Sequence, residues 1–197
     1  MIKPRVPRQS RGSPPVKKHE PGRRELLVWG ASAFAATVAK PAVAMRGGGD
    51  RRKLAFYNLH TGESLDTVYW AEGAYVAEAL KDVDRVLRDF RTGDIHPIDR
   101  RLLDLLARLR AALASDEAFH VISGYRSPRT NAMLAANSEG VAVHSLHLDG
   151  MAIDIRVPGR TLAALREAAV ALQGGGVGYY RASDFVHVDV GRVRRWG

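Results

Sequence analysis

Two segments decide the fold expected for this chain: Ala152-Ile153-Asp154-Ile155-Arg156-Val157 and Phe185-Val186-His187-Val188-Asp189-Val190. Both alternate aliphatic and polar side chains, a pattern typical of β-strands with one buried face. The aliphatic side chains would face the core. Asp154 would lie on the other face of the first strand, and His187 would share that face of the second strand with Asp189. If the strands pair, Asp154 and His187 lie roughly 5 Å apart across the ladder.

The loop before the first strand is also rich in polar side chains and reads Ser145-Leu146-His147-Leu148-Asp149-Gly150-Met151. From this loop His147 could join Asp154 and His187 as a third metal ligand. Two imidazoles and one carboxylate leave the fourth position of a tetrahedral zinc ion open, as in catalytic sites. Zinc there would acidify a water molecule and polarise a carbonyl group. Ordinary polar positions on a sheet are equally compatible with the spacing alone.

Two histidines and a carboxylate could instead form a non-haem iron site. Such sites usually place a histidine and the carboxylate close together on one strand. His147 and Asp154 are seven residues apart, which argues against iron.

The elements around these strands predict an α+β domain, a small antiparallel sheet flanked by helices. Apolar residues recur with a helical period in four segments: 75–90, 97–113, 128–136 and 161–172. Further strands are expected at 53–60, 63–70, 119–123 and 178–180. Thr61-Gly62 separates the first two of these strands, which predicts a hairpin.

The formal net charge of +9 is concentrated at the N-terminus. Residues 1–44 contain nine Lys and Arg against two Glu, whereas the remainder contains 21 basic and 19 acidic residues. The basicity therefore gives little support to a nucleic-acid-binding function. The chain has no cysteine, which excludes disulfides, thiolate metal sites and cysteine nucleophiles.

The N-terminal segment is typical of an export signal. Arg23-Arg24 precedes an uncharged run of 14 residues, Leu26 to Ala39, which is too short for a spanning helix of about 20 residues. The run is followed by Ala42-Val43-Ala44, a pattern that suits a signal peptidase. We expect residues 1–44 to be a cleaved, twin-arginine-like signal, 45–52 a flexible junction and 53–197 the folded, functional domain. A buried helix preceded by a disordered tail is the alternative.

Three motifs follow one another along the chain: Ser123-Gly124-Tyr125-Arg126-Ser127, the segment from Ser145 to Asp154, and Phe185-Val186-His187-Val188-Asp189. In this order they resemble the motifs of the LAS zinc peptidases (lysostaphin, D-Ala-D-Ala peptidase, hedgehog). Within that group the chain resembles the exported murein endopeptidases of the D-Ala-D-Ala-carboxypeptidase-like type. The resemblance covers about residues 53–197 and implies a hedgehog/D-Ala-D-Ala-peptidase-like fold.

The resemblance also implies roles for individual residues. His147, Asp154 and His187 would hold one zinc ion. Arg126 would stabilise the oxyanion or anchor a substrate carboxylate, since a guanidinium offers fixed and permanently charged donors. Relatives carry a Glu or an Asp three residues before the last histidine as the general base, and that position is Asp184 here.

Asp189 competes with Asp184 for the role of base, either as the base itself or as a partner that orients a histidine. His144 is a third candidate and is more plausibly a substrate contact. Three further parts of the chain are expected to line the cleft: Tyr125, Ser145 and 174–180.

The implied activity is zinc-dependent hydrolysis of peptide cross-links in peptidoglycan, at the L,D bonds between two diaminopimelate residues. The alternatives are a D,D-endopeptidase or carboxypeptidase on the same polymer, and a non-catalytic, zinc-containing wall-binding module. The expected partners are peptidoglycan stem peptides in the periplasm, with no nucleic acid and no stable membrane insertion after signal removal. The sequence leaves the oligomeric state open.

Overall fold

The computed structural model describes residues 50–137, 142 and 144–197. The expected export signal, its cleavage site and most of the 45–52 junction lie outside these residues. Arg52, at the end of that junction, is already the first residue of a strand. In the described part of the chain, no helix combines the length and the apolar character needed to cross a bilayer.

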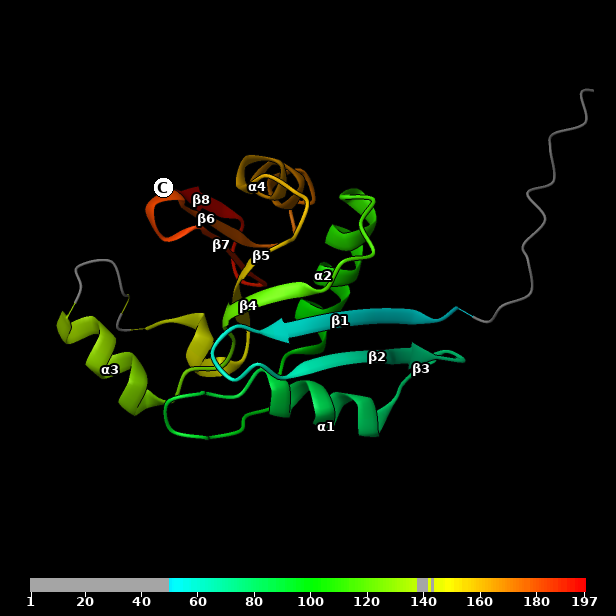
Figure 1. The fold of residues 1–197 in the computed structure, drawn as a ribbon, viewed down its shortest axis with the longest axis horizontal. Coiled ribbons are helices and arrows are strands. Elements are labelled where there is room, and N and C mark those ends of the chain that lie inside the picture. Colours follow the sequence, from blue (N-terminus) through cyan, green and yellow to red (C-terminus); the bar gives the residue numbers. More distant parts are fainter. Residues whose placement is uncertain (1–49, 138–141, 143) are drawn as a thin grey trace, which may run out of the picture. The chain divides into compact units, whose positions relative to one another are not determined.

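One mixed sheet of eight strands organises the described residues, in the order β3-β2-β1-β4-β5-β7-β6-β8 (Figure 1). Its strands are β1 (Arg52–Asn58), β2 (Ser64–Ala71), β3 (Ala74–Tyr75), β4 (Phe119–Ser123), β5 (Ala152–Arg156), β6 (Gly176–Tyr180), β7 (Phe185–Asp189) and β8 (Arg194–Trp196). The predicted α+β class is confirmed. The sheet is larger than expected and not wholly antiparallel, because β1 pairs with β4 and β6 with β8 in parallel.

Four α-helices accompany the sheet: α1 (Ala77–Val86), α2 (Arg100–Ala112), α3 (Pro128–Asn137) and α4 (Leu162–Ala171). Two short 3-10 turns, η1 (Leu146–Asp149) and η2 (Arg181–Ser183), precede β5 and β7. Asp99 and Thr161 cap α2 and α4 by accepting hydrogen bonds from backbone N–H groups of the first turn. The first helix is shorter than the expected 75–90, because β3 takes its first residue and the chain leaves the helix after Val86.

The apolar core lies where the helices cover the sheet: α1 packs on β2, α2 on β1, and α4 on β6 and β7. As the alternation predicted, Ile153 and Ile155 of β5 and Val186 and Val188 of β7 are buried in this core. Each fully buried aliphatic side chain of this kind contributes about 2 kcal/mol to stability. The core fixes which face of β5 and β7 is apolar, so their polar residues must lie on the opposite face.

A register shift between Val121 and Ser123 changes the direction of β4 side chains next to that polar face. Val121 pairs with Ile155 and is buried in the core, whereas Ser123 pairs with Asp154. A bulge of this kind re-aims a side chain without ending the strand. Ser123 therefore lies on the same face as Asp154, where it contributes to the site described next.

Candidate metal centre

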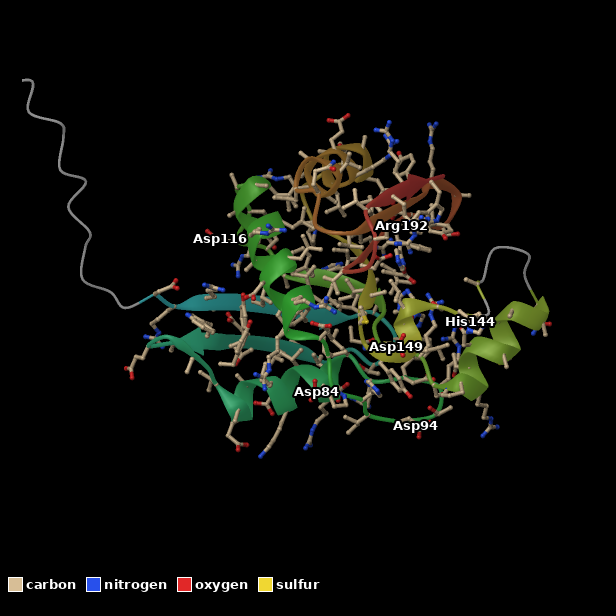
Figure 2. The ribbon with its side chains drawn as sticks, turned by 180° about the vertical axis from the view of Figure 1, so that it is seen from behind. Asp84, Asp94, Asp116, His144, Asp149 and Arg192 are labelled. Atoms are coloured by element: carbon tan, nitrogen blue, oxygen red, sulfur yellow. The ribbon has the colours of Figure 1, made fainter. Side chains whose placement is uncertain are left out.

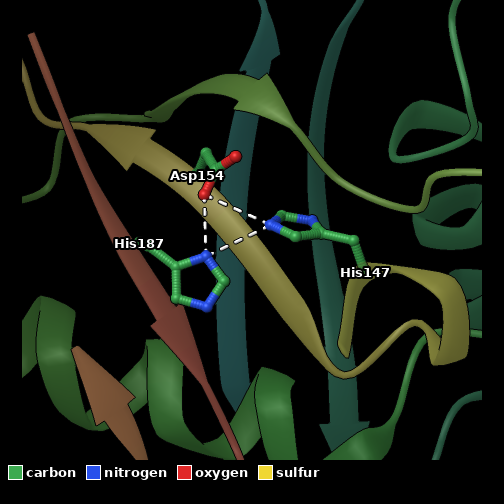
Figure 3. A group of neighbouring side chains, drawn as sticks. All are labelled: His147, Asp154 and His187. Carbon is green, nitrogen blue, oxygen red and sulfur yellow. Dashed lines mark hydrogen bonds and ion pairs between the residues drawn. The ribbon is translucent and has the colours of Figure 1, made fainter. Parts of the chain in front are cut away.

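Asp154 and His187 are directly opposed partners on the antiparallel strands β5 and β7. His147 approaches them from η1 (Figure 3). The Oδ1 atom of Asp154 lies 2.9 Å from His187 Nδ1 and 3.2 Å from His147 Nε2, and the two nitrogens are 3.2 Å apart. All three side chains are buried. The strand pairing expected from the sequence is therefore present, and it brings the three predicted ligands together.

Two hydrogen bonds hold His147 in this position. Ser145 caps η1, its hydroxyl accepting a hydrogen bond from the backbone N–H of His147. The His147 Nδ1–H donates to the carbonyl oxygen of Gly124 at 2.6 Å. A Cβ at Gly124 would overlap the carbonyl of Leu87, so only glycine allows this close packing of the Ser-Gly-Tyr-Arg segment. With Nδ1 protonated, the lone pair of Nε2 faces Asp154 and His187.

Asp189 fixes the orientation of His187 in the same way. The His187 Nε2–H donates to Asp189 Oδ2 at 3.1 Å, which leaves the lone pair of Nδ1 on the side of Asp154. Asp189 is fully buried, and it also accepts hydrogen bonds from the backbone N–H groups of Gly176 and Gly191 and from Arg194. The second histidine therefore has a fixed tautomer as well.

The donor set fits a bound cation. Ligand atoms of His147, Asp154 and His187 all lie within 4.8 Å of one another. Two imidazole nitrogens and a carboxylate oxygen converge on one place, where a positive charge would be stabilised. Nitrogen and carboxylate ligands with an open fourth position suit a catalytic zinc ion. Among the described residues, this is the one cluster of three or more such ligands.

The electrostatics of Asp154 and His147 agree with this interpretation, whereas for His187 burial alone would lower the pKa but Asp154 and Asp189 raise it. Burial alone would raise the pKa of Asp154, but His147 and His187 hold that pKa below its usual range. Burial lowers the pKa of His147 and so favours the neutral ring that a metal requires. The site thus presents an ionised carboxylate and a neutral imidazole at neutral pH.

Arg126 lies beside the cluster and is largely buried. Its Nη2 donates to Asp154 Oδ2 at 2.5 Å, and its Nε donates to Ser123 Oγ at 2.9 Å. Its backbone N–H donates to the carbonyl of His147 at 3.1 Å. Arg126 therefore binds the outer oxygen of Asp154 and leaves Oδ1 to the two histidines.

A cavity of about 620 Å³ opens on the cluster. Its lining residues are Arg126, Leu134, Ala142, His144, Ser145, Leu146, His147, Asp154, Tyr180, Ser183, Phe185, His187, Arg194 and Trp196. Ser145 and Tyr180 line the cleft as expected. His144, the third candidate for the base, lines it too and lies on the segment that leads to η1 (Figure 2). Tyr125 is not among the lining residues, because its ring stacks on His96 with centroids 4.8 Å apart. Residues 174–179 do not line it either.

Asp184, the first candidate for the general base, is not brought to the cluster. It occupies the left-handed region of the backbone at the turn before β7, with φ of 53°. Its carboxylate is exposed and pairs with Arg156 Nη1 at 2.6 Å. It lines a separate cavity of about 260 Å³ together with His120. Asp189 is behind His187 rather than in the cleft, so among described residues Asp154 is the one carboxylate that lines the cavity.

Sequence reasoning missed the contribution of β8. This strand brings Arg194 and Trp196 to the cavity, and neither was expected there. Three residues are too few to show an alternating pattern, so their period gives no signal. The parallel pairing with β6 that positions them is visible only in the folded chain.

Residues 46–196 match a protein-family model of the M15_2 peptidases, described as "Peptidoglycan L,D-endopeptidase MepK". The chain belongs to this family. It is 41% identical over 182 residues to the peptidoglycan L,D-endopeptidase MepK of Escherichia coli K12, an alignment that covers 92% of this chain and all of the relative. The probable peptidoglycan L,D-endopeptidase MepK of Haemophilus influenzae is 41% identical over 146 residues, which cover 74% of this chain and 78% of that protein.

Family membership confirms the resemblance that the three motifs indicated. M15 peptidases are metallopeptidases, and the His147, Asp154 and His187 cluster offers such an enzyme a metal-binding triad. Sequence and structure thus agree on a metallopeptidase, and the polar face of β5 and β7 carries a candidate metal-binding triad.

Proposed function

We propose that this protein is a zinc-dependent murein endopeptidase that hydrolyses L,D peptide cross-links between diaminopimelate residues of peptidoglycan. The observation that supports it best is the convergence of two oriented histidines and a carboxylate on one point, at the floor of an open cavity. The relatives that match this chain along most of its length bear the name of that activity.

His147, Asp154 and His187 would hold the zinc ion. When bound there, zinc supplies Lewis acidity, lowering the pKa of a water molecule and polarising the scissile carbonyl. The protein fixes the two histidine tautomers through Gly124 and Asp189. This preorganisation keeps three ligands in place without any rearrangement during the reaction.

Arg126 would stabilise negative charge that develops on the scissile carbonyl oxygen, or anchor a substrate carboxylate. Its guanidinium lines the cavity next to the cluster, and its hydrogen bonds to Ser123 and Asp154 restrict its movement. A rigid, permanently charged donor beside the reacting carbonyl is worth more in a shielded site than in water.

Proton transfer to the leaving amine needs a titratable group in the same cavity. His144 lines that cavity, whereas the carboxylate of Asp184 pairs with Arg156 and lines another one. We therefore assign the proton-transfer role to His144 and the orientation of His187 to Asp189. This assignment replaces the order expected from the sequence, in which Asp184 came first.

The proposed activity has a direct test. The purified protein is assayed for bound metal and incubated with sacculi that contain both L,D and D,D cross-links, beside a His187→Ala variant. We expect one zinc per chain and conversion of L,D dimers to monomers by the intact protein alone. If the protein consumed D,D dimers instead, it would be a D,D-endopeptidase. If it bound zinc but cleaved neither kind of dimer, a non-catalytic wall-binding module would be favoured.

We also propose that the protein acts in the periplasm after export through residues 1–44. The paired arginines, the short apolar run and the Ala-x-Ala sequence support a twin-arginine signal. Fusion of residues 1–50 to a reporter, with Arg23 and Arg24 both changed to Lys, tests the route. Export that persists in the double variant would contradict it.

A further inference from the structure

Five residues form one row across the sheet, each directly opposite the next. From β4 to β8 the row is Ser123, Asp154, His187, Gly178 and Trp196. Side chains opposite each other in a ladder lie on the same face. The row therefore runs from the residue that holds Arg126, through two of the proposed metal ligands, to the penultimate residue of the chain.

Gly178 leaves a gap in this row, and the indole of Trp196 fills it. A Cβ at Gly178 would lie 2.6–2.7 Å from Cε2, Cζ2 and Nε1 of the indole, closer than real atoms approach. The indole thus reaches over Gly178, and its ring centroid lies 5.3 Å from that of His187. Any larger residue at position 178 would push Trp196 away from the metal centre.

Neighbouring side chains hold the indole in this place. Its Nε1–H donates to the hydroxyl of Tyr180 at 3.0 Å, and Tyr180 stacks on Phe185 with centroids 4.6 Å apart. On its own strand, the Arg194 guanidinium lies 4.9 Å from the indole centroid and pairs with the buried Asp189. Trp196 is only half-buried and lines the cavity. The exposed part of the indole is therefore available to a ligand in the cavity.

The walls of the cavity differ in chemistry. Arg126 provides a charged group on the β4 side of the triad, whereas Trp196, Tyr180 and Phe185 provide an aromatic surface on the other side. Arg194 of β8 also lines the cavity there, but its guanidinium is paired with the buried Asp189. A cross-linked diaminopimelate residue matches this contrast, since it keeps a free carboxylate at one end of a hydrocarbon chain. We propose that Trp196 is a substrate-contacting residue, its indole packing against the hydrocarbon chain of a diaminopimelate residue beside the scissile bond. This inference rests on the proposed function for the identity of the substrate.

Three variants and a control test this contact. Trp196→Ala removes the indole, Trp196→Phe keeps part of the aromatic surface, and Gly178→Ala displaces the indole without removing it. Arg195→Gln is the control, because Arg195 is an exposed neighbour on the opposite face of β8. Each zinc-loaded protein is assayed for kcat and KM on L,D-cross-linked dimers, for calorimetric binding of the monomeric product, for zinc content and for melting temperature.

For Trp196→Ala we expect KM and the product Kd to rise about tenfold or more, while kcat stays within about threefold and zinc content is unchanged. Trp196→Phe should recover part of the loss, Gly178→Ala should shift both constants in the same direction as Trp196→Ala, and Arg195→Gln should match the parent. If Trp196→Ala does not fold, the same comparison is made with Trp196→Phe and Gly178→Ala.

Unchanged KM and product Kd in the folded Trp196 and Gly178 variants would overturn the inference. So would a loss of zinc that accounts for the whole effect, because Trp196 would then support the metal centre alone. The proposed function fails separately, if the parent protein cleaves no L,D dimer. In that case, weaker product binding by Trp196→Ala would still support the contact between Trp196 and diaminopimelate, in a protein that binds the polymer without cutting it.

Discussion

The Asp189 carboxylate lies behind His187, two residues further along the same strand, and accepts its Nε2–H at 3.1 Å. Asp189 is fully buried, yet its two oxygens have four different donors: His187, Arg194 and the backbone of Gly176 and Gly191. Burial alone would raise the pKa of Asp189, but these donors hold it well below its usual range. The aspartate is therefore an anion at neutral pH, and it orients the ring of His187 so that Nδ1 faces Asp154 and the candidate metal centre.

Replacement of Asp189 should lower the affinity of the protein for zinc. We expect Asp189→Asn to lower zinc affinity by roughly 10–100-fold, since the histidine loses its anionic partner and part of its orientation. Competition with a chromophoric chelator measures the affinity. Asp184→Asn is the matched control, because Asp184 is exposed and lines another cavity. Equal affinities in the two variants would show that Asp189 has no role in metal binding.

Removal of the metal should destabilise the protein as well as inactivate it. The two imidazole nitrogens lie 3.2 Å apart in a buried site and share one carboxylate oxygen of Asp154, so a bound cation would stabilise the folded protein. At a thousandfold excess of free zinc over its Kd, binding should add about 4 kcal/mol to the free energy of unfolding. Urea unfolding with and without chelator measures this difference, and added zinc should restore it. His147→Ala should show no response to zinc; a response equal to that of the parent would exclude His147 as a ligand.

The two candidates for proton transfer should respond differently to substitution. We expect Asp184→Asn to keep kcat within about threefold of the parent, and His144→Gln to lower kcat by about 100-fold or more with little change in zinc content. The measurement is kcat on L,D-cross-linked dimers over a range of pH. A large loss in Asp184→Asn would mean that Asp184 leaves Arg156 during turnover, and would restore the order expected from the sequence.

The central part of the site could be predicted from the sequence because it depends on local periodicity. Alternation in β5 and β7 assigns Ile153 and Val186 to the core, and it therefore assigns Asp154 and His187 to the opposite face. The register between β5 and β7 then follows, since a shift by one residue would move Asp154 and His187 to the apolar face. His147 was found because it lies in the loop that enters β5.

Features that depend on pairing between distant segments were not predictable in the same way. The bulge that turns Ser123 toward Asp154 breaks the simple alternation of β4. Trp196 reaches the cavity only because β8 pairs in parallel with β6, where Gly178 leaves room. Asp184 was placed in the site by the resemblance to the zinc peptidases, yet the backbone at that residue is left-handed and its side chain pairs with Arg156.

Asp89 links the loop after α1 to the segment that contains Arg126. Its buried carboxylate accepts hydrogen bonds from the backbone N–H of Arg91 at 2.9 Å and from the backbone N–H and hydroxyl of Ser127 at 2.9 and 2.7 Å. Burial alone would raise the pKa of Asp89, but hydrogen bonds from Thr130, Ser127 and Arg91 lower it to about 2, against an ordinary value of 3.8. Because Ser127 immediately precedes α3, the Asp89 carboxylate lies near the N-terminus of that helix, where the helix dipole also favours a negative charge.

The low pKa of Asp89 predicts a stabilisation that acid removes. Because the folded protein binds this proton less readily than the unfolded chain does, the ionised carboxylate contributes about 2 kcal/mol of stability above pH 4. That contribution should disappear as the pH falls from about 4 to about 2, through the pKa of the folded state. Asp89→Asn should therefore be less stable than the parent at pH 7, and the gap should shrink with acid. Urea unfolding of both proteins at several pH values measures the gap; one that stays constant with pH would show that the Asp89 carboxyl has the same pKa in the folded and unfolded chains.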